Sequence, residues 1–438
     1  MTGRDLPAGL AAGSWLVRGA RLIDTVAGSE LHGDIYLCRE GVFPGPGEEG
    51  AFEIDGSDLW VFPGLLDMHV HLRVPGPGRA ETLESGLRCA LAGGVTSLCM
   101  MPNTDPPLDS PDLVRSLLES CASLGYPGAN VAACLTRGRR GAELTDLEEL
   151  HQAGARAFTD DGDPLEDDSL FAEALERIGA LDAVLMEHPE VRSISAGGCV
   201  NEGRAARLSG VGGIPCRSEI ADVQRCLELV RAGGGRLHLT HLSCPESVEM
   251  VAGARAGGLP VSCDVTPHHI ALDDSEIRRV GAMAKMNPPL RTAEQRERLA
   301  RMTAAGLVDA VASDHAPHPD SSKRKPIAEA SFGITGLETL LPVTLEVLGR
   351  EMGLAASGVI SLLTTGPARV LGLTLPGLLG DGGSRPAVLF DPGAGYTLER
   401  VGTFSRSRNT PFLDRPLTGR VKGVWIGRPA YLGGMFAT

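Results

Sequence analysis

The middle of the chain alternates short apolar segments with segments of helical spacing, and this alternation limits the fold more than any other feature. The apolar segments have the length and composition of buried strands, and they are residues 95–103, 130–136, 156–161, 182–188, 236–243, 259–269 and 309–315. Helical spacing occurs between them, for example over 112–124, 170–181 and 219–233. Such alternation is typical of a parallel α/β sheet, and the number of repeats predicts a (β/α)₈ TIM-like barrel.

The two ends of the chain differ from this middle. Short apolar runs separated by glycine-rich turns occupy 15–24 and 59–64, and similar runs return over 387–392 and 419–427. This pattern predicts strands joined by turns. We therefore predict that residues 1–60 and 376–438 together form a small β-sandwich domain, and that residues 61–375 form the barrel. A length of 438 residues fits one barrel with an accessory domain.

Polar side chains follow the apolar segments at the point where each predicted strand ends. The first strand ends in DMHVHLR, where alternation places His69 and His71 on the same face. Later strands end in further carboxylates and histidines, which are Asp160, Asp161, His188, His241 and Asp314. Because the active site of a TIM barrel lies at the carboxyl ends of its strands, we expect these side chains to converge.

Four histidines and two carboxylates are a suitable ligand set for two divalent metal ions, most naturally Zn²⁺. A carboxylate can bridge two ions, and a water molecule between them becomes a strong nucleophile near neutral pH. Any single histidine is explained better by packing, but coincidence is a poor explanation for five strands that end this way. His238 lies three positions before His241 and therefore points to the opposite face, where we expect a packed side chain.

The charge and composition of the chain indicate which binding partners and which cellular compartment to expect. The net charge of −14 argues against non-specific binding to nucleic acid or to an anionic membrane. We find no signal peptide and no apolar run of transmembrane length, so we expect a cytoplasmic protein. The ten cysteines are scattered without a C-x-x-C pair, which favours reduced thiols in the core.

Several motifs in order resemble one known family. They include PGLLDMHVHLR at 63–73, MPNT at 101–104, AFTDDG at 157–162 and SDHAPH at 313–318. Together they resemble type I dihydroorotase of the amidohydrolase superfamily, over about Leu22 to Gly427. The resemblance implies a metal-dependent enzyme of pyrimidine synthesis that interconverts N-carbamoyl-L-aspartate and L-dihydroorotate, with one or two Zn²⁺ per subunit and no organic cofactor.

The resemblance also implies roles for individual residues. The metal ligands would be His69, His71, Asp161, His188, His241 and Asp314. The substrate contacts would be His71, Arg73, Asn103, Asn287, His318, Phe332 and Gly333. Asp314 would be the catalytic residue that carries a proton between the nucleophile and the leaving amide nitrogen. Arg73 and Asn103 would bind the substrate carboxylate, since a planar guanidinium can bind it through two hydrogen bonds.

Two local features refine this resemblance. Hydantoinases, dihydropyrimidinases and allantoinases use a carboxylated lysine as the bridging ligand, whereas RAFTDDG contains no lysine and offers Asp161. Asp161 is preferred over Asp160 because its spacing to His188 matches the family. After His188 the family usually continues Cys-Glu-Asp, but this chain has Pro189-Glu190-Val191, so the second metal site can differ. The polar segment 318–333 is expected to be an active-site lid.

Two other functions remain open at this point. One is a related hydrolase that acts on a different cyclic amide or ureide. The other is a non-enzymatic subunit that serves as a scaffold for aspartate transcarbamoylase, although such subunits typically lose metal ligands. The resemblance further suggests a homodimer and an assembly with aspartate transcarbamoylase as partners to test.

Overall fold

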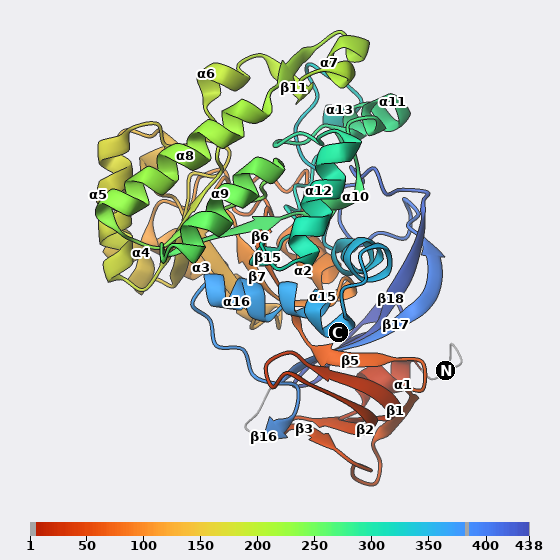
Figure 1. Cartoon of the computed structure of the whole chain (residues 1–438). Helices are drawn as coiled ribbons and strands as arrows, with labels where there is room; N and C mark the ends of the chain where they lie inside the picture. Colours follow the sequence, from red (N-terminus) through yellow and green to blue (C-terminus); the bar gives the residue numbers. More distant parts are fainter. Residues whose placement is uncertain (1–5, 382–384, 438) are drawn as a thin grey trace.

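The computed structural model describes residues 6–381 and 385–437 and contains a nearly closed barrel of eight parallel strands (Figure 1). In barrel order the strands are β6 (Leu65–Val70), β7 (Val95–Met100), β8 (Ala129–Ala133), β9 (Ala155–Phe158), β10 (Val184–Glu187), β13 (Leu237–Leu239), β14 (Val261–Val265) and β15 (Ala310–Val311). A parallel bridge between Val70 and His315 joins the last strand to the first. The predicted (β/α)₈ class is confirmed.

The strands are apolar because both of their faces are covered, as is usual in parallel sheets. All six residues of β6 are buried. The barrel interior is filled by side chains such as Leu66, Met68 and Ala157, which pack against Ala368 and Val370 of α16 (Thr365–Val370). This packing fills the interior below the carboxyl ends of the strands, where the polar residues lie.

Helices surround the barrel. The longer ones are α2 (Leu83–Ala92), α3 (Pro111–Ser123), α5 (Asp168–Ala180), α8 (Cys216–Gly233), α9 (Pro245–Ala256) and α12 (Ala293–Ala304), with α4 (Leu147–Gln152) and α15 (Ala356–Leu362) among the shorter ones. Capping side chains fix where some of them begin; Thr82 and Thr292 each form a capping box, with Ser85 and Gln295 respectively. Apolar residues of the helices and of the outer strand faces form the largest hydrophobic core.

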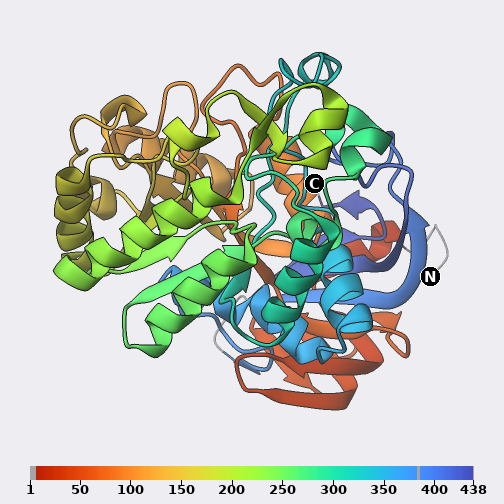
Figure 2. The same cartoon turned by 45° about the horizontal axis from the view of Figure 1, so that its top comes forward.

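The end of the barrel away from the small sheet carries the longer connections, which Figure 2 brings forward. Their short elements are α6 (Arg192–Ser195), β11 (Gly198–Asn201), α7 (Arg204–Ser209), β12 (Gly212–Ile214), α10 (Pro267–Ala271), α11 (Glu276–Val280) and α13 (Asp320–Lys323). A separate apolar cluster that includes Leu272, Met286 and Phe412 supports them. In the described part of the chain, no helix has the length and apolar character needed to cross a membrane.

Both ends of the chain contribute to one ten-stranded sheet, which confirms the predicted β-domain of N- and C-terminal segments. Its strands are β1 (Trp15–Asp24), β2 (Ser29–Cys38), β3 (Gly41–Pro44), β4 (Phe52–Asp55), β5 (Trp60–Pro63), β16 (Gly380–Asp381), β17 (Pro386–Thr397), β18 (Pro416–Ile426), β19 (Pro429–Leu432) and β20 (Met435–Phe436). The rings of Trp15 and Trp425, from opposite ends of the sequence, pack with centroids 5.5 Å apart in its core.

One glycine connects the two parts. Strand β5 belongs to the small sheet, β6 belongs to the barrel, and only Gly64 lies between them. A Cβ atom at Gly64 would lie 1.8 Å from Oγ1 of Thr96, so no other residue fits this close approach. On its other edge β5 pairs antiparallel with β17, for example Val61 with Leu389. The exact domain boundaries given above stay a prediction.

Candidate active site

His69 and His71 lie at the carboxyl end of the first barrel strand. Their ring centroids are 5.1 Å apart, on the inner side of the barrel. Val70 and Leu72 alternate with them and are buried in the core between barrel and helices. The alternation in DMHVHLR thus presents two imidazoles to one spot and anchors the segment by its apolar residues.

Asp161 lies at the centre of the four histidines. Its Oδ1 atom is 3.4 Å from Nε2 of His69, 3.7 Å from Nδ1 of His188 and 3.5 Å from Nε2 of His241. Its Oδ2 atom is 3.5 Å from Nε2 of His71. All five side chains are buried. Of the six side chains proposed as ligands, the structure thus places the four histidines around the carboxylate of Asp161.

These residues fit metal ions. Two groups of side chains offer possible ligand atoms, and within each group these atoms all lie within 4.8 Å of one another. The groups are His69–His71–Asp161 and Asp161–His188–His241, so Asp161 belongs to both. Both ring nitrogens of His69, Oδ1 of Asp161 and Nδ1 of His241 are buried without a hydrogen-bond partner among the described residues. Buried polar atoms normally have partners, so this cluster has the donor set of a two-ion site that shares a carboxylate.

The charges of the site favour a cation in the same place. Burial alone would lower the pKa of His69, but the carboxylates of Asp161 and Asp314 outweigh it and raise that pKa to about 9. Burial likewise opposes the charged form of His188, whereas Asp161 and Glu190 raise its pKa to about 10. The surrounding carboxylates therefore stabilise positive charge at the centre of the cluster.

Asp314, the sixth proposed ligand, faces the first histidine pair. Its Oδ1 atom lies 3.1 Å from Nε2 of His71 and 3.9 Å from Nε2 of His69. Asp314, His241 and Arg73 have φ angles of +46°, +39° and +58°, in the left-handed region that non-glycine residues rarely adopt. Strained backbone of this kind is typical of functional sites, where it aims a side chain that regular strand geometry would not place there.

Arg73 and Asn103 form a polar pair beside the cluster. Oδ1 of Asn103 accepts a hydrogen bond from Nη1 of Arg73 at 3.4 Å and lies 2.6 Å from Nδ1 of His71. Among the side chains that the structure describes, no carboxylate forms an ion pair with the Arg73 guanidinium. Burial lowers the pKa of Arg73, against the opposing effect of Asp314 and Asp161. A partly buried guanidinium without a carboxylate partner is well suited to bind an anion.

A pocket of about 190 Å³ opens above the cluster. Ten of the proposed site residues line it, namely His71, Arg73, Asn103, Asp161, His188, His241, Asn287, Asp314, Phe332 and Gly333. His69 lies beneath it and is buried, and His318 is not part of its lining. A Cβ atom at Gly333 would lie 2.6 Å from Cβ of Ala316, and the φ angle of Gly333 is +108°, so a glycine is required at this wall.

Other histidines and carboxylates have packing roles. His238 is buried, as we expected, and its ring bonds Oγ of Ser262 at 2.8 Å and Oδ2 of Asp264 at 2.9 Å. Oδ1 of Asp160 accepts hydrogen bonds from the backbone of Leu135 and Thr136, at 2.9 and 3.1 Å. Asp160 therefore holds the neighbouring β8 loop, while Asp161 faces the histidines.

Sequence reasoning missed Glu190. Its Oε2 atom accepts a hydrogen bond from Nδ2 of Asn287 at 2.9 Å and lies 3.5 Å from Nε2 of His188. A carboxylate behind a ligand imidazole fixes the orientation of the ring and increases its basicity. Glu190 thus supplies this contact despite the unusual Pro189 and Val191 on either side of it, and the His-x-Glu spacing was the signal available in the sequence.

Sequence reasoning also missed the lysines that hold the segment 318–333. Lys323 is buried, and its Nζ atom donates hydrogen bonds to the carbonyl oxygens of Ala282, Lys285 and Ser331 at 2.8–3.0 Å. Nζ of Lys285 lies 4.2 Å from the ring centroid of Phe332. These contacts fix the wall formed by Phe332 and Gly333. The sequence predicted an active-site lid for this segment, but its run DSSKRK gave no signal that Lys323 is buried.

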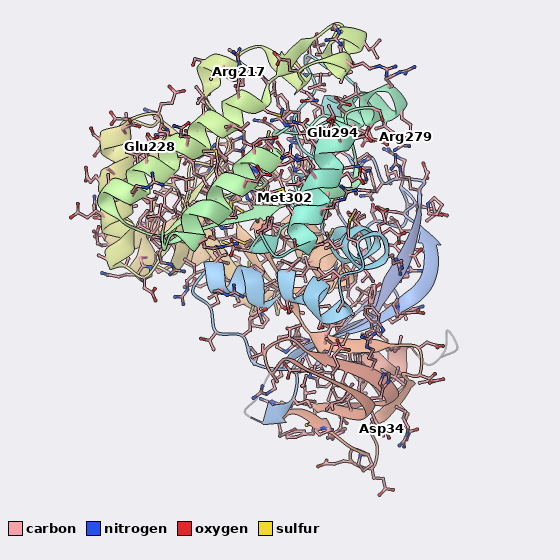
Figure 3. All side chains as sticks on the ribbon, viewed as in Figure 1. Asp34, Arg217, Glu228, Arg279, Glu294 and Met302 are labelled. Carbon is pink, nitrogen blue, oxygen red and sulfur yellow. The ribbon has the colours of Figure 1, made fainter. Side chains whose placement is uncertain are left out.

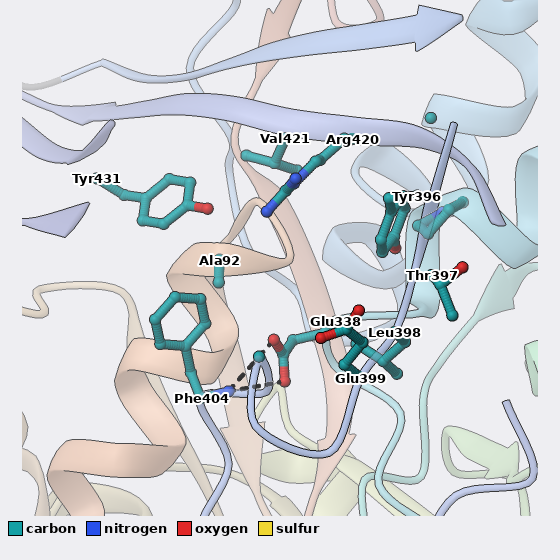
Figure 4. A pocket seen from close by; sticks show the side chains of 13 residues that line it. Ala92, Glu338, Tyr396, Thr397, Leu398, Glu399, Phe404, Arg420, Val421 and Tyr431 are labelled. Carbon is teal, nitrogen blue, oxygen red and sulfur yellow. Dashed lines mark hydrogen bonds between the residues drawn. The ribbon is translucent and has the colours of Figure 1, made fainter. Parts of the chain in front are cut away.

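A second cavity, of about 270 Å³, lies between the barrel and the long hairpin of β17 and β18 (Figure 4). Its lining includes Glu338, Tyr396, Phe404, Arg420 and Tyr431, and none of the proposed site residues. Glu338 accepts hydrogen bonds from the backbone nitrogen of Phe404, at 3.2 and 3.3 Å. Burial raises the pKa of Glu338 to about 7.

Solved structures share this architecture. The L-hydantoinase (dihydropyrimidinase) from Arthrobacter aurescens has a TM-score of 0.82 at 24% identity, and the match covers 97% of each chain. The dihydropyrimidinase from Brevibacillus agri has a TM-score of 0.80 at 20% identity, and the match covers 97% of this chain and 96% of the other. At these identities the likeness concerns the fold. In this chain the barrel carries a shared histidine–aspartate cluster at its carboxyl face, which is the donor set of a metal-dependent hydrolase.

Sequence comparison identifies the family to which this chain belongs. Residues 59–247 match the family model described as Dihydro-orotase-like. The dihydroorotase of Solibacter usitatus is 37% identical over 411 residues, which are 92% of this chain and 94% of the relative. The dihydroorotase of Anaplasma phagocytophilum is 38% identical over 430 residues, or 94% of each chain. The chain belongs to the dihydroorotase family.

Proposed function

We propose that this protein is a dihydroorotase, which closes N-carbamoyl-L-aspartate to L-dihydroorotate and opens the ring in reverse. The proposal rests above all on Arg73, a guanidinium that shares a pocket with the histidine–aspartate cluster and lacks a carboxylate partner among the described residues. Dihydroorotate carries one carboxylate, on the ring carbon two positions from the carbonyl carbon of the amide that is cleaved. The geometry therefore suits a small cyclic amide that bears an anionic group.

Binding and orientation would come from the residues around the pocket. Arg73 would hold the substrate carboxylate through charge-assisted hydrogen bonds, and Asn103 would add an amide donor beside it. Asn287 faces the pocket from the side of His188, where it can contact the substrate ring. Phe332 and Gly333 would cover the ring and exclude water, since Lys285 and Lys323 hold this wall in place. His318 lies behind Gly333 and would support this wall.

Proton transfer would be the task of Asp314. Its carboxylate lies in the pocket lining next to His71, so it can accept a proton from the attacking water. It would return this proton to the amide nitrogen when the ring opens, and the same steps in reverse would close the ring. When bound, the metal ions supply Lewis acidity for the amide carbonyl and lower the pKa of water.

We propose Zn²⁺ as the metal, because imidazole nitrogens and carboxylate oxygens are its usual ligands in hydrolytic sites. His69 and His71 would hold one ion, His188 and His241 a second, and Asp161 would bridge them, with Asp314 as a further ligand of the first. Two ions per subunit are favoured over one, since Glu190 supports His188 and so completes the second half of the site.

A direct assay tests the proposed activity. The purified metal-loaded protein is expected to turn over L-dihydroorotate and N-carbamoyl-L-aspartate, and to act at least about 100-fold less efficiently on hydantoin and allantoin, which lack the carboxylate. Turnover of hydantoin or allantoin without turnover of dihydroorotate would instead assign the chain to a related activity. Metal analysis in the same preparation separates an inactive apoenzyme from a non-enzymatic scaffold subunit.

The remaining proposals concern the setting of the enzyme. A homodimer and an assembly with aspartate transcarbamoylase are suggested by the resemblance to type I dihydroorotases. Analytical ultracentrifugation of the protein alone, and then with that partner, measures both. We also propose a cytoplasmic location. We further propose domain boundaries at residues 60/61 and 375/376, and limited proteolysis would test these boundaries.

A further inference from the structure

Two cysteines meet where helices α8 and α9 begin. Cys216 is the first residue of α8, and Cys244 is the residue that immediately precedes α9. The thiol of Cys244 donates a long hydrogen bond, at 4.0 Å, to the carbonyl oxygen of Cys216, and the same thiol helps to lower the pKa of Cys216. Cys244 follows His241 beyond the carboxyl end of β13, so the pair lies at the same end of the barrel as the site. The label of Arg217 marks the start of α8 in Figure 3.

The two helix starts are held together by a buried carboxylate. Oε1 of Glu219, on α8, accepts hydrogen bonds from the backbone nitrogens of Ser243 and Cys244 at 3.2 and 3.0 Å. Arg291 completes the arrangement by an ion pair with Glu219 at 3.6 Å and a hydrogen bond to Oγ of Ser243 at 2.9 Å. The position of Cys244 relative to Cys216 is therefore fixed by contacts that involve neither thiol.

The surroundings of Cys216 stabilise a thiolate. The hydrogen bond from Cys244, the charge of Arg291 and the amide of Gln295 lower the pKa of Cys216 to about 7, against burial and the charge of Glu219. The amide nitrogen of Gln295 donates to Sγ of Cys216 at 3.0 Å. The first turn of an 18-residue helix adds a favourable dipole. These are the conditions in which a thiol becomes nucleophilic at neutral pH.

The other cysteines provide the contrast. Nine of the ten are buried, and Cys216 alone has intermediate exposure. Burial raises the pKa of Cys99 and that of Cys121 to about 12, and it raises the pKa of Cys89, Cys226 and Cys263 well above the ordinary value. Cys244 is buried as well, and burial raises its pKa well above the ordinary value. One reachable, acidic thiol thus lies beside one protected thiol, which is the arrangement of a reactive and a resolving cysteine.

We propose that Cys216 and Cys244 form a thiol modification site, at which a hydroperoxide oxidises the pair reversibly to a disulfide. The Cys216 thiolate attacks one peroxide oxygen, the O–O bond breaks, and Cys216 becomes a sulfenic acid as hydroxide leaves. The sulfur of Cys244 then attacks that of Cys216, so the S–S bond forms, the S–O bond breaks, and the hydroxide takes the thiol proton. In total two thiols lose two electrons, and one hydrogen peroxide is reduced to two waters.

The experiment counts free thiols in the metal-loaded full-length protein before and after exposure to hydrogen peroxide. We expect the count under denaturing conditions to fall from ten to eight and to return to ten after dithiothreitol. Peptide mapping should find the new disulfide between Cys216 and Cys244. Alkylation of Cys216 by iodoacetamide should accelerate with rising pH, with a midpoint at about 7.

Three variants make the outcome specific. Cys216→Ser should lose no thiols to peroxide, while Cys244→Ser should stop at a sulfenic acid on Cys216 that dimedone traps. Cys38→Ser removes a buried thiol from the small sheet and should still lose two. The proposal is overturned if the wild-type protein keeps ten thiols, if the disulfide joins other cysteines, or if Cys216→Ser loses thiols as the wild type does.

Discussion

Replacement of Arg73 by methionine tests how the pocket reads its substrate. Methionine keeps much of the length and apolar volume of the arginine stem but has no charge and no donor. The guanidinium donates a hydrogen bond to Oδ1 of Asn103 and has no carboxylate partner among the described residues. Its removal therefore costs little native ion pairing, and the effect on binding of the substrate carboxylate can be measured separately.

The magnitude follows from the hydrogen bonds that are lost. Hydrogen bonds to charged groups contribute about 1.5–3 kcal/mol each. Removal of one partner of a desolvated charge pair costs about 2–5 kcal/mol. A loss of about 3 kcal/mol corresponds to about a 100-fold reduction in kcat/KM, since 1.4 kcal/mol is a factor of ten. Most of it should be seen as a higher KM, because the carboxylate is bound in both the ground state and the transition state.

The assay compares two substrates that differ only in the carboxylate. Initial rates of ring opening are measured on L-dihydroorotate and on 5,6-dihydrouracil, which is the same ring without this group. Arg73→Met should lower kcat/KM for dihydroorotate about 100-fold and leave that for dihydrouracil within about threefold. Arg73→Lys, which keeps the charge but loses the planar fork, should give an intermediate loss.

Two results would refute the assigned role of Arg73. In the first, Arg73→Met turns over dihydroorotate like the wild type. In the second, the variant loses activity equally on both substrates while its metal content is unchanged. The second result would mean that Arg73 acts on the reacting amide or on the cluster itself. Metal analysis and a thermal unfolding curve for each variant exclude misfolding as the cause.

Three further predictions follow from contacts described above. Asp314→Ala should abolish turnover while metal content stays largely intact, because His69, His71 and Asp161 remain; metal loss in proportion to activity would contradict this. Glu190→Gln should weaken metal binding about 10–100-fold in a chelator competition, with exposed Glu202→Gln as the unaffected control. Burial raises the pKa of Glu338 from 4.5 to about 7, so this carboxyl keeps its proton to a higher pH in the folded chain than in the unfolded chain. As the pH rises from 4.5 to 7, the free energy of unfolding should therefore fall by up to about 3 kcal/mol, and above pH 7 it should level off. Denaturant unfolding at several pH values should show this fall in the wild type and not in Glu338→Gln.

The sequence predicted the positions of the proposed ligands because they depend on strand position alone. Once the strands are parallel and close into a barrel, His69, His188 and His241 must lie at one end, whatever the details of packing. The small sheet was predictable for a similar reason, since both ends of the chain show the same pattern of strands and turns. These are properties of short segments, which one sequence reveals.

Pairings between distant charged residues could not be predicted. Glu190 contacts Asn287 across 97 positions, and neither residue carries a local signal for the other. Lys323 lies in a run of charges that is typical of an exposed loop, yet carbonyl groups from two segments surround its ammonium group. The contact between Cys216 and Cys244 also depends on how two helices pack, and this is set by the whole barrel.

The connection through Gly64 has a consequence for the order of folding. The strand that carries His69 continues from β5, and β5 is flanked by β1 on one side and by β17 on the other. The pairing of Val61 with Leu389 can therefore form only after Leu389, more than three hundred residues later in the sequence, has been synthesised. Pairings of such long sequence separation form late and slowly. We expect a growing chain to hold its barrel helices before the first strand is locked, so that the metal centre is assembled among the last parts of the molecule.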